Sequence, residues 1–176
     1  PADAVRYWTA SGGLGHDVPF SENTLKIGQK LLVKLWNASL FLFEHISPFS
    51  DQLSCDGDFG LLNEWILHKI SEVHGNYVRY FDKHEFSLAL NSVEQFFWHD
   101  FCDNYLELIK NQFFKPELYS AHEITATRYV LDMVFLRILQ WYAPYIPHST
   151  EMIYQHLYKE RCLVQSIHQT KFSRIK

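Results

Sequence analysis

The amino-acid sequence predicts an all-α fold: an antiparallel bundle of four long helices, with short helices at its ends. Three observations predict this class. Apolar residues recur at steps of three and four along most of the 176 residues, the period of a helix with one buried face. Short polar or proline-containing segments separate these stretches. Hydrophobic residues make up 47% of the chain, which is enough for one well-buried core.

The first elements are a short helix and a long one. The spacing predicts a short helix over residues 2–11, which ends at a glycine pair beginning at Gly12, because glycines favour a turn. Ser21 has the side chain of an N-cap, and it predicts the start of a long helix that runs to about Glu44. Pro48 and the polar residues after it predict a loop.

Three further long helices and a short one follow. Apolar residues on one stripe predict a helix over 60–82, and the next helix is expected over 85–113. Ser120 with Glu123 three residues later forms a capping-box pattern, which predicts a fourth long helix that ends before the prolines of "APYIP". A short helix is expected over 150–159.

The helix over 85–113 has a predicted core face. At about 100° per residue, one narrow sector contains the apolar residues Phe86, Leu90, Val93, Phe97, Phe101 and Leu108. The same rotation places Asn104 in that sector, so we expect its amide to be hydrogen-bonded inside the bundle or next to a wetter neighbour. The predicted domain organisation is a connector over 1–20, the helical bundle over 21–160, and a C-terminal tail over 161–176 without a clear pattern.

Charge and cysteine content exclude several classes of function. The formal net charge of −4 gives no overall basic field, so any nucleic-acid contact needs a local patch. Cys55, Cys102 and Cys162 are far apart and form no CxxC pair, which argues against a disulfide framework or a zinc knuckle and favours a reducing cytoplasm. The sequence has no long uncharged apolar run and no signal-peptide pattern, so we expect no membrane contact.

The stretch "FFWHDFCDNYLELIK" brings His99, Cys102 and Asp103 close together in sequence. A catalytic cysteine needs a base within hydrogen-bonding reach and an orienting group, which one helix rarely supplies. The zinc-protease pattern HExxH is absent. We therefore expect a surface His–Asp pair beside a packed cysteine, with no catalytic residues and no metal ligands. A stand-alone metal or thiol enzyme is the alternative.

The same stretch resembles a helix in the C-terminal bundle of class I aminoacyl-tRNA synthetases, which has this order of aromatic, Cys-Asp and Leu-Glu residues. Three more blocks resemble the valyl branch of that family, in the right order: "ADAVRYWTASGGLGHDVPFSE", "KIGQKLLVKLWNASLFL" and "APYIPHSTEMIYQHL". The blocks span about residues 2–157. Three positions depart from the family pattern: Pro1 stands where the family usually has Gly, Leu40 where the valyl branch usually has Arg, and Asn104 where the family usually has Trp.

The resemblance implies the anticodon-binding domain of an ATP-dependent aminoacyl-tRNA ligase. The HIGH and KMSKS motifs, to which the family's ATP chemistry belongs, are absent, so this segment is expected to be inactive alone and to have no cofactor of its own. ATP and Mg²⁺ would bind elsewhere in a longer chain, of which this is expected to be a fragment. The implied partners are a valine tRNA and the missing catalytic and editing domains. The alternatives are a sister enzyme (isoleucyl or leucyl) and a helical protein-interaction module.

Several side chains are candidates for RNA contact. Lys26, Lys30 and Lys34 recur every four residues, and Asn37 lies at nearly the same helical angle, so together they would form a basic stripe that ends in a residue able to read a base edge. The alternative is an ordinary solvated helix face. The other candidate cations are Arg6, Arg128 and Arg137, and the aromatic residues that could stack on a base, or pack in the core, are Trp36 and Trp98.

Overall fold

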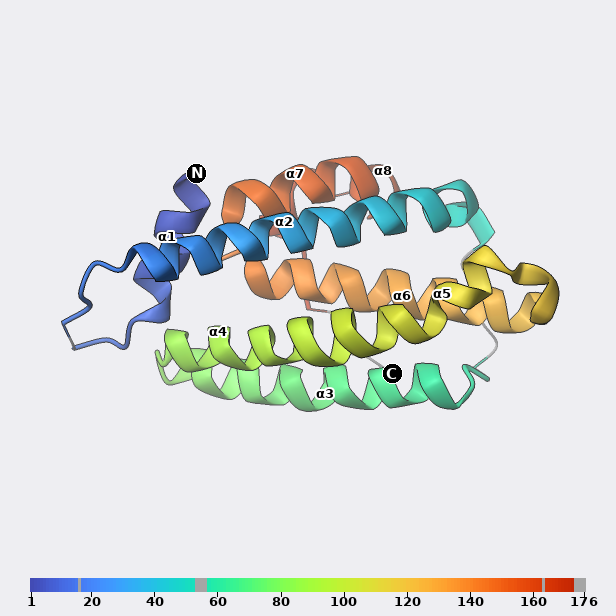
Figure 1. Ribbon diagram of the computed structural model, residues 1–176, viewed down its shortest axis with the longest axis horizontal. Coiled ribbons are helices and arrows are strands. Elements are labelled where there is room, and N and C mark those ends of the chain that lie inside the picture. The colour runs from blue at the N-terminus through green and yellow to red at the C-terminus, as the bar shows by residue number, and fades with distance from the viewer. Residues whose placement is uncertain (16, 53–56, 163, 173–176) are drawn as a thin grey trace.

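The computed structural model describes residues 1–15, 17–52, 57–162 and 164–172, which contain helices and no strand. The predicted all-α class is therefore confirmed. The long helices run along the long axis of the molecule (Figure 1). In that view α2 (Glu22–His45) and α7 (Pro147–Leu157) lie above α6 (Ala121–Tyr142), and α3 (Leu61–Asp82) and α4 (Phe86–Gln95) lie below it. Among the described residues, no helix is both long and apolar enough to cross a membrane.

The core is one continuous cluster of apolar side chains, with α6 at its centre. Buried residues occur around most of the circumference of α6, because α2, α3, α4 and α7 all pack against it. α1 (Ala2–Ser11) joins this core through Tyr7, which is 4% exposed. The short helix at the start is thus part of the bundle.

Both predicted N-caps are present. The Ser21 hydroxyl accepts a hydrogen bond from the Thr24 amide at 3.3 Å, where α2 begins. At the start of α6 the capping box is complete: the Ser120 hydroxyl accepts from the Glu123 amide at 3.2 Å, and the Glu123 carboxylate accepts from the Ser120 amide at 2.8 Å. These bonds satisfy amides that a helix start leaves without partners.

The helix predicted over 85–113 is interrupted by a π-helical segment, η2 (Phe96–Tyr105), before it continues as α5 (Leu106–Phe114). Five fully buried residues explain the interruption, because they follow one another at steps of four: Val93, Phe97, Phe101, Tyr105 and Ile109. In an α-helix each such step turns the side chain by about 40° away from the core. A π-helix has wider turns, closed by hydrogen bonds that reach five residues back, and it keeps the row on one face.

Two predictions within this helix were wrong for that reason. Leu108 was expected in the core, but its side chain is 59% exposed and Ile109 is buried instead. Asn104 was expected among apolar residues, but it is exposed, and its side-chain amide donates to the His99 carbonyl at 2.7 Å. The wide turn rotates every residue after Phe101 relative to the α-helical expectation.

The last helix begins earlier than predicted. α7 starts at Pro147, in the first-turn position that proline favours. The buried Asp3 carboxylate of α1 accepts from the Ser149 amide and the Ser149 hydroxyl, both at 2.7 Å. Because the Ser149 amide belongs to the first turn of α7, Asp3 caps α7 from another helix.

Shorter elements complete the chain. They are η1 (Ser47–Gln52), η3 (Pro116–Leu118), α8 (Lys159–Cys162) and η4 (Ile167–Gln169). The tail packs on α7: Ile167 is 2% exposed, and the Glu151 carboxylate accepts from the Ile167 amide at 3.1 Å and from the Ser166 hydroxyl at 2.8 Å. Cys55 lies outside the described residues.

Candidate nucleic-acid interface

A hollow of about 540 Å³ lies between α2 and the π-helical segment, and it contains the predicted basic stripe. Its lining includes all four residues of that stripe, together with Trp98 from η2; the full set is Asn23, Lys26, Ile27, Gln29, Lys30, Val33, Lys34, Asn37 and Trp98. The stripe forms because α2 turns by about 40° every four residues, so the three lysines drift only slowly around the outer face of the helix.

A second hollow of about 270 Å³ continues the first towards the C-terminal end of α2. The two share Lys34 and Asn37; the second is lined by Lys34, Asn37, Ala38, Phe41, Cys102, Leu106, Glu107 and Lys110. We call the two hollows together the α2 groove. One side of this groove is α2, and the other is the π-helical segment with the start of α5.

The α2 groove is positive although the chain is acidic. Four lysines and one glutamate line it, a formal charge of +3, or +2 when Asp103, which pairs with Lys34 at 3.8 Å, is included. Lys110 pairs with Glu107. Lys26 and Lys30, in contrast, have no ion-pair partner among the described residues. Two ammonium groups are therefore available to an incoming anion.

A second strip on α2 is apolar and lies beside the basic one. Four large side chains on this strip are exposed: Val33, Trp36, Leu40 and Phe43. Trp36 is 40% exposed and lines a separate hollow with Met152 and Ile153 of α7. The two candidate tryptophans thus lie on different sides of α2, and only Trp98 lines the groove that holds the lysines.

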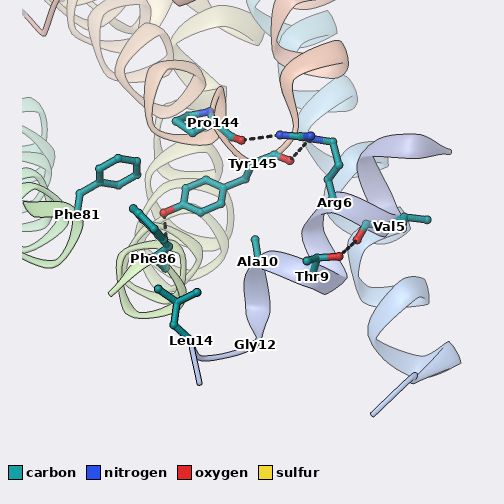
Figure 2. A pocket seen from close by; sticks show the side chains of 10 residues that line it. All are labelled: Val5, Arg6, Thr9, Ala10, Gly12, Leu14, Phe81, Phe86, Pro144 and Tyr145. Atoms are coloured by element: carbon teal, nitrogen blue, oxygen red, sulfur yellow. Dashed lines mark hydrogen bonds between the residues drawn. The ribbon is translucent and has the colours of Figure 1, made fainter. Parts of the chain in front are cut away.

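Arg6 lies away from the α2 groove, near the end of the bundle where α1 packs. Its Nε donates to the Tyr145 carbonyl at 3.2 Å and its Nη2 to the Pro144 carbonyl at 3.1 Å (Figure 2). The two carbonyls follow the last turn of α6, so the cation meets the negative end of that helix. Arg6 also lines an apolar hollow of about 500 Å³ between α1 and the α3–α4 turn, together with Phe81 and Phe86.

Arg128 and Arg137 serve the packing of α6. The Arg128 Nε donates to the His45 carbonyl at 3.2 Å, and its guanidinium stacks on Phe49 with 3.5 Å to the ring centroid. Arg137 is only 3% exposed; its guanidinium lies 5.0 Å from the centroid of the Phe172 ring, and burial lowers its pKa to about 10. Neither arginine lines the α2 groove.

The His–Cys–Asp stretch has the geometry expected of a surface pair beside a packed thiol. His99 Nδ1 lies 3.8 Å from an Asp103 oxygen, and both side chains are more than half exposed. Cys102 is 2% exposed, and burial raises the pKa of its thiol to about 12. A neutral, buried thiol is a poor nucleophile. The described residues also contain no group of three or more His, Cys, Asp or Glu residues placed to hold a metal ion.

Sequence reasoning did not find the second side of the groove. Lys110 and Phe41 line it from helices that are far apart in sequence, and the spacing along either helix alone gives no sign that they meet. The available signal was the row of apolar residues at steps of four, which indicates the π-helical turn that directs Trp98 and Cys102 towards α2.

Comparison with known proteins assigns the family. Residues 63–176 match the model of a family described as the anticodon-binding domain of tRNA ligase. The chain is 42% identical over 169 residues, 94% of its length, to the valine–tRNA ligase of Ehrlichia canis. It is 41% identical to that of Wolbachia sp. subsp. Brugia malayi over 90% of the chain, and 35% identical to that of Haloarcula marismortui over 97%.

The chain spans about a fifth of the length of these ligases, 20%, 18% and 18% respectively. The family match starts within α3. The matches to the ligases cover most of the chain, and therefore include α2 with its basic stripe. These comparisons confirm the resemblance to the valyl branch and favour it over a protein-interaction module. The helical bundle, the family match and the aligned ligases agree, and the chain belongs to the anticodon-binding domains of tRNA ligases.

Proposed function

We propose that this chain is the anticodon-binding domain of a cytoplasmic valine–tRNA ligase, and that it holds the anticodon loop of a valine tRNA in the α2 groove. The observation that carries the proposal is the meeting of three lysines, Asn37 and Trp98 in one hollow of a chain whose net charge is −4. Lysines hold phosphates, whereas amide and aromatic side chains contact unpaired bases.

The task of such a domain is positioning. Binding of the anticodon loop orients the whole tRNA, so that its acceptor end meets catalytic and editing domains elsewhere in a longer chain. ATP and Mg²⁺ would act in those domains. The HIGH and KMSKS motifs are absent from this sequence, so we expect no aminoacylation by this chain alone.

The test is a fluorescence-anisotropy titration of the chain with a valine-tRNA anticodon stem-loop over a series of salt concentrations. The double variant Lys26→Ala/Lys30→Ala removes the two unpaired ammonium groups. We expect it to weaken binding at least 10-fold and to lower the slope of log K against log salt by about 1–2, since each phosphate contact contributes roughly 0.7–0.9.

The matched control is Lys69→Ala/Lys83→Ala, which removes the same charge from α3 and from the C-cap residue that follows it, on the lower side of the bundle in Figure 1. This control should retain almost all the affinity. If both double variants lost the same affinity for the stem-loop, the effect would come from net charge alone. That result would contradict specific binding in the α2 groove.

A second stem-loop with a changed anticodon tests discrimination. Preferential binding of the valine loop supports base readout by this domain. Equal, salt-sensitive binding of both loops would mean that the α2 groove binds phosphates without reading the bases of the anticodon.

A further inference from the structure

Trp98 is a fixed aromatic surface on the side of the groove opposite the lysines. It is the third residue of the π-helical segment and is half-buried, and the Phe97 ring packs against it edge-on at 5.9 Å between centroids. Its remaining surface lines the hollow. Among the described residues, no group accepts a hydrogen bond from its indole N–H.

Lys34 covers this surface through weak contacts. Its ammonium lies 5.8 Å from the centroid of the Trp98 ring and 3.8 Å from Asp103. The Lys34 and Asp103 side chains are 39% and 57% exposed, and ion pairs with this exposure contribute little to stability. Lys34 can therefore leave the ring at small cost when a stronger partner, such as a phosphate, enters.

Asn37 lies in the same hollow, on the α2 side. It is exposed, and its amide has no hydrogen-bond partner among the described residues. A side-chain amide offers both a donor and an acceptor, the pair of functions that recognises a base edge. The hollow thus combines a ring face, a mobile cation and an unused amide.

We propose that Trp98 is a stacking platform for one unpaired nucleotide. On binding, Lys34 moves from the ring to a neighbouring phosphate, the base takes its place over Trp98, and Asn37 hydrogen-bonds to the base edge. This inference rests on the proposed RNA-binding function, and it adds the residue that holds a base and the exchange that opens its site. Stacking on an aromatic side chain suits unpaired bases because every base has a π-face.

Trp36 provides a matched control. It is the same residue type and is also partly exposed, but it faces α7 across a separate hollow, without any of the three lysines. If exposed aromatic surface binds RNA non-specifically, replacement of either tryptophan should weaken binding equally. If Trp98 is a stacking site, only its replacement should weaken binding.

The experiment compares Trp98→Ala, Trp98→Phe and Trp36→Ala in the anticodon stem-loop titration. Loss of one base–aromatic stack corresponds to about a 5- to 150-fold loss of affinity, which is the range expected for Trp98→Ala. Trp98→Phe should lose less, because a smaller ring remains. Trp36→Ala should change affinity less than 2-fold. The salt slope of Trp98→Ala should equal that of the unmodified chain, since no charge is removed.

Stem-loops with one abasic nucleotide at each loop position identify the stacked base. In the unmodified chain one such position should show a large loss, and in Trp98→Ala the same position should become nearly silent, because the two changes remove one contact. Circular dichroism checks that each variant is folded. Where Trp98→Ala unfolds, Trp98→Phe replaces it in the same comparison with the abasic stem-loops.

The outcomes separate the two proposals. The stacking platform would be overturned if binding depended on the lysines but not on Trp98. It would also be overturned if an abasic nucleotide lowered the affinity equally with and without Trp98. Both results would leave the proposed function intact. No binding by the unmodified chain, or binding indifferent to Lys26 and Lys30, would overturn the proposed function itself.

Discussion

Gly28 of α2 lies directly against the Tyr7 ring of α1, and it leaves no room there for a larger side chain. A Cβ built on Gly28 would lie 2.8 Å from Cδ1 of Tyr7. The Tyr7 ring is buried, and its hydroxyl donates to a Glu94 carboxylate oxygen at 2.8 Å. Because that bond fixes the ring, the ring cannot move aside to accommodate an added methyl group.

We therefore expect Gly28→Ala to lower the free energy of unfolding by about 1–3 kcal/mol, since overpacking costs more here than alanine gains in helix propensity. Urea denaturation followed by circular dichroism measures the change. Gly75→Ala in α3 is the control: its added Cβ meets nothing within 4 Å, and we expect a gain of about 0.5–1 kcal/mol. A Gly28→Ala variant as stable as Gly75→Ala would contradict this account of the α1–α2 contact.

The capping of α7 by Asp3 is a contact between elements. Asp3 belongs to α1, is 2% exposed, and accepts from the amide of Ser149 in the first turn of α7. Its negative charge also lies at the positive end of that helix. One side chain thus satisfies a helix start and joins two helices that are far apart in sequence.

Replacement of this carboxylate should destabilise the bundle. We expect Asp3→Ala to cost about 1–3 kcal/mol of unfolding free energy, from the lost cap and from the amide left without a partner. Asp3→Asn should cost less, because asparagine is also a good N-cap. Thermal unfolding of the three proteins gives the order, and equal midpoints for Asp3→Ala and the unmodified chain would show that α7 needs no cap from α1.

At the scale of elements, the sequence predicted the helices but not their local geometry. Ser21 and Ser120 located two helix starts, because a capping hydroxyl is a local signal. The π-helical turn was missed, because α-helical periodicity was assumed through Phe97 and Phe101, and Leu108 was consequently assigned to the wrong face. The relevant signal was present as a strict four-residue step.

The candidate site shows the same limit. The lysine stripe could be predicted, because it lies on one helix and depends only on spacing. The burial of Arg137 could not be predicted in the same way. α6 lies at the centre of the bundle and nearly all of its faces are covered, so that Arg137 is only 3% exposed. Which helix occupies the centre depends on how the helices pack together, and no single helix contains that information.

At the scale of the whole molecule, the half-buried His74 links stability to pH. His74 of α3 accepts from the Trp141 indole N–H at 3.3 Å, and burial, with the charge of Arg137, lowers its pKa. The unfolded chain, in which histidine has its ordinary pKa near 6.5, therefore takes up a proton first as pH falls. The contribution of neutral His74 to the free energy of unfolding is therefore complete above about pH 6.5, and it is lost as the pH falls towards the lowered pKa of the folded state.

We expect the free energy of unfolding to decrease from pH 7 to pH 5, and His74→Gln to show a smaller decrease over the same range. Urea denaturation at several pH values measures both. His122→Gln, at an exposed position near the start of α6, is the control and should keep the dependence of the unmodified chain. A His74→Gln variant with an unchanged dependence would assign the effect to other groups.

The anchoring of α1 by Asp3, Arg6 and Tyr7 also has a mechanical consequence. α2 has 24 residues and is therefore about 36 Å long, so a rotation of α2 and the helices packed on it by about 5° relative to α1 would displace the far end of α2 by about 3 Å. In the proposed ligase, α1 would hold α2 in a fixed orientation, and with it the groove that binds the RNA. The hydrogen bonds of these three side chains would then determine the orientation of a tRNA whose reacting end lies in another domain.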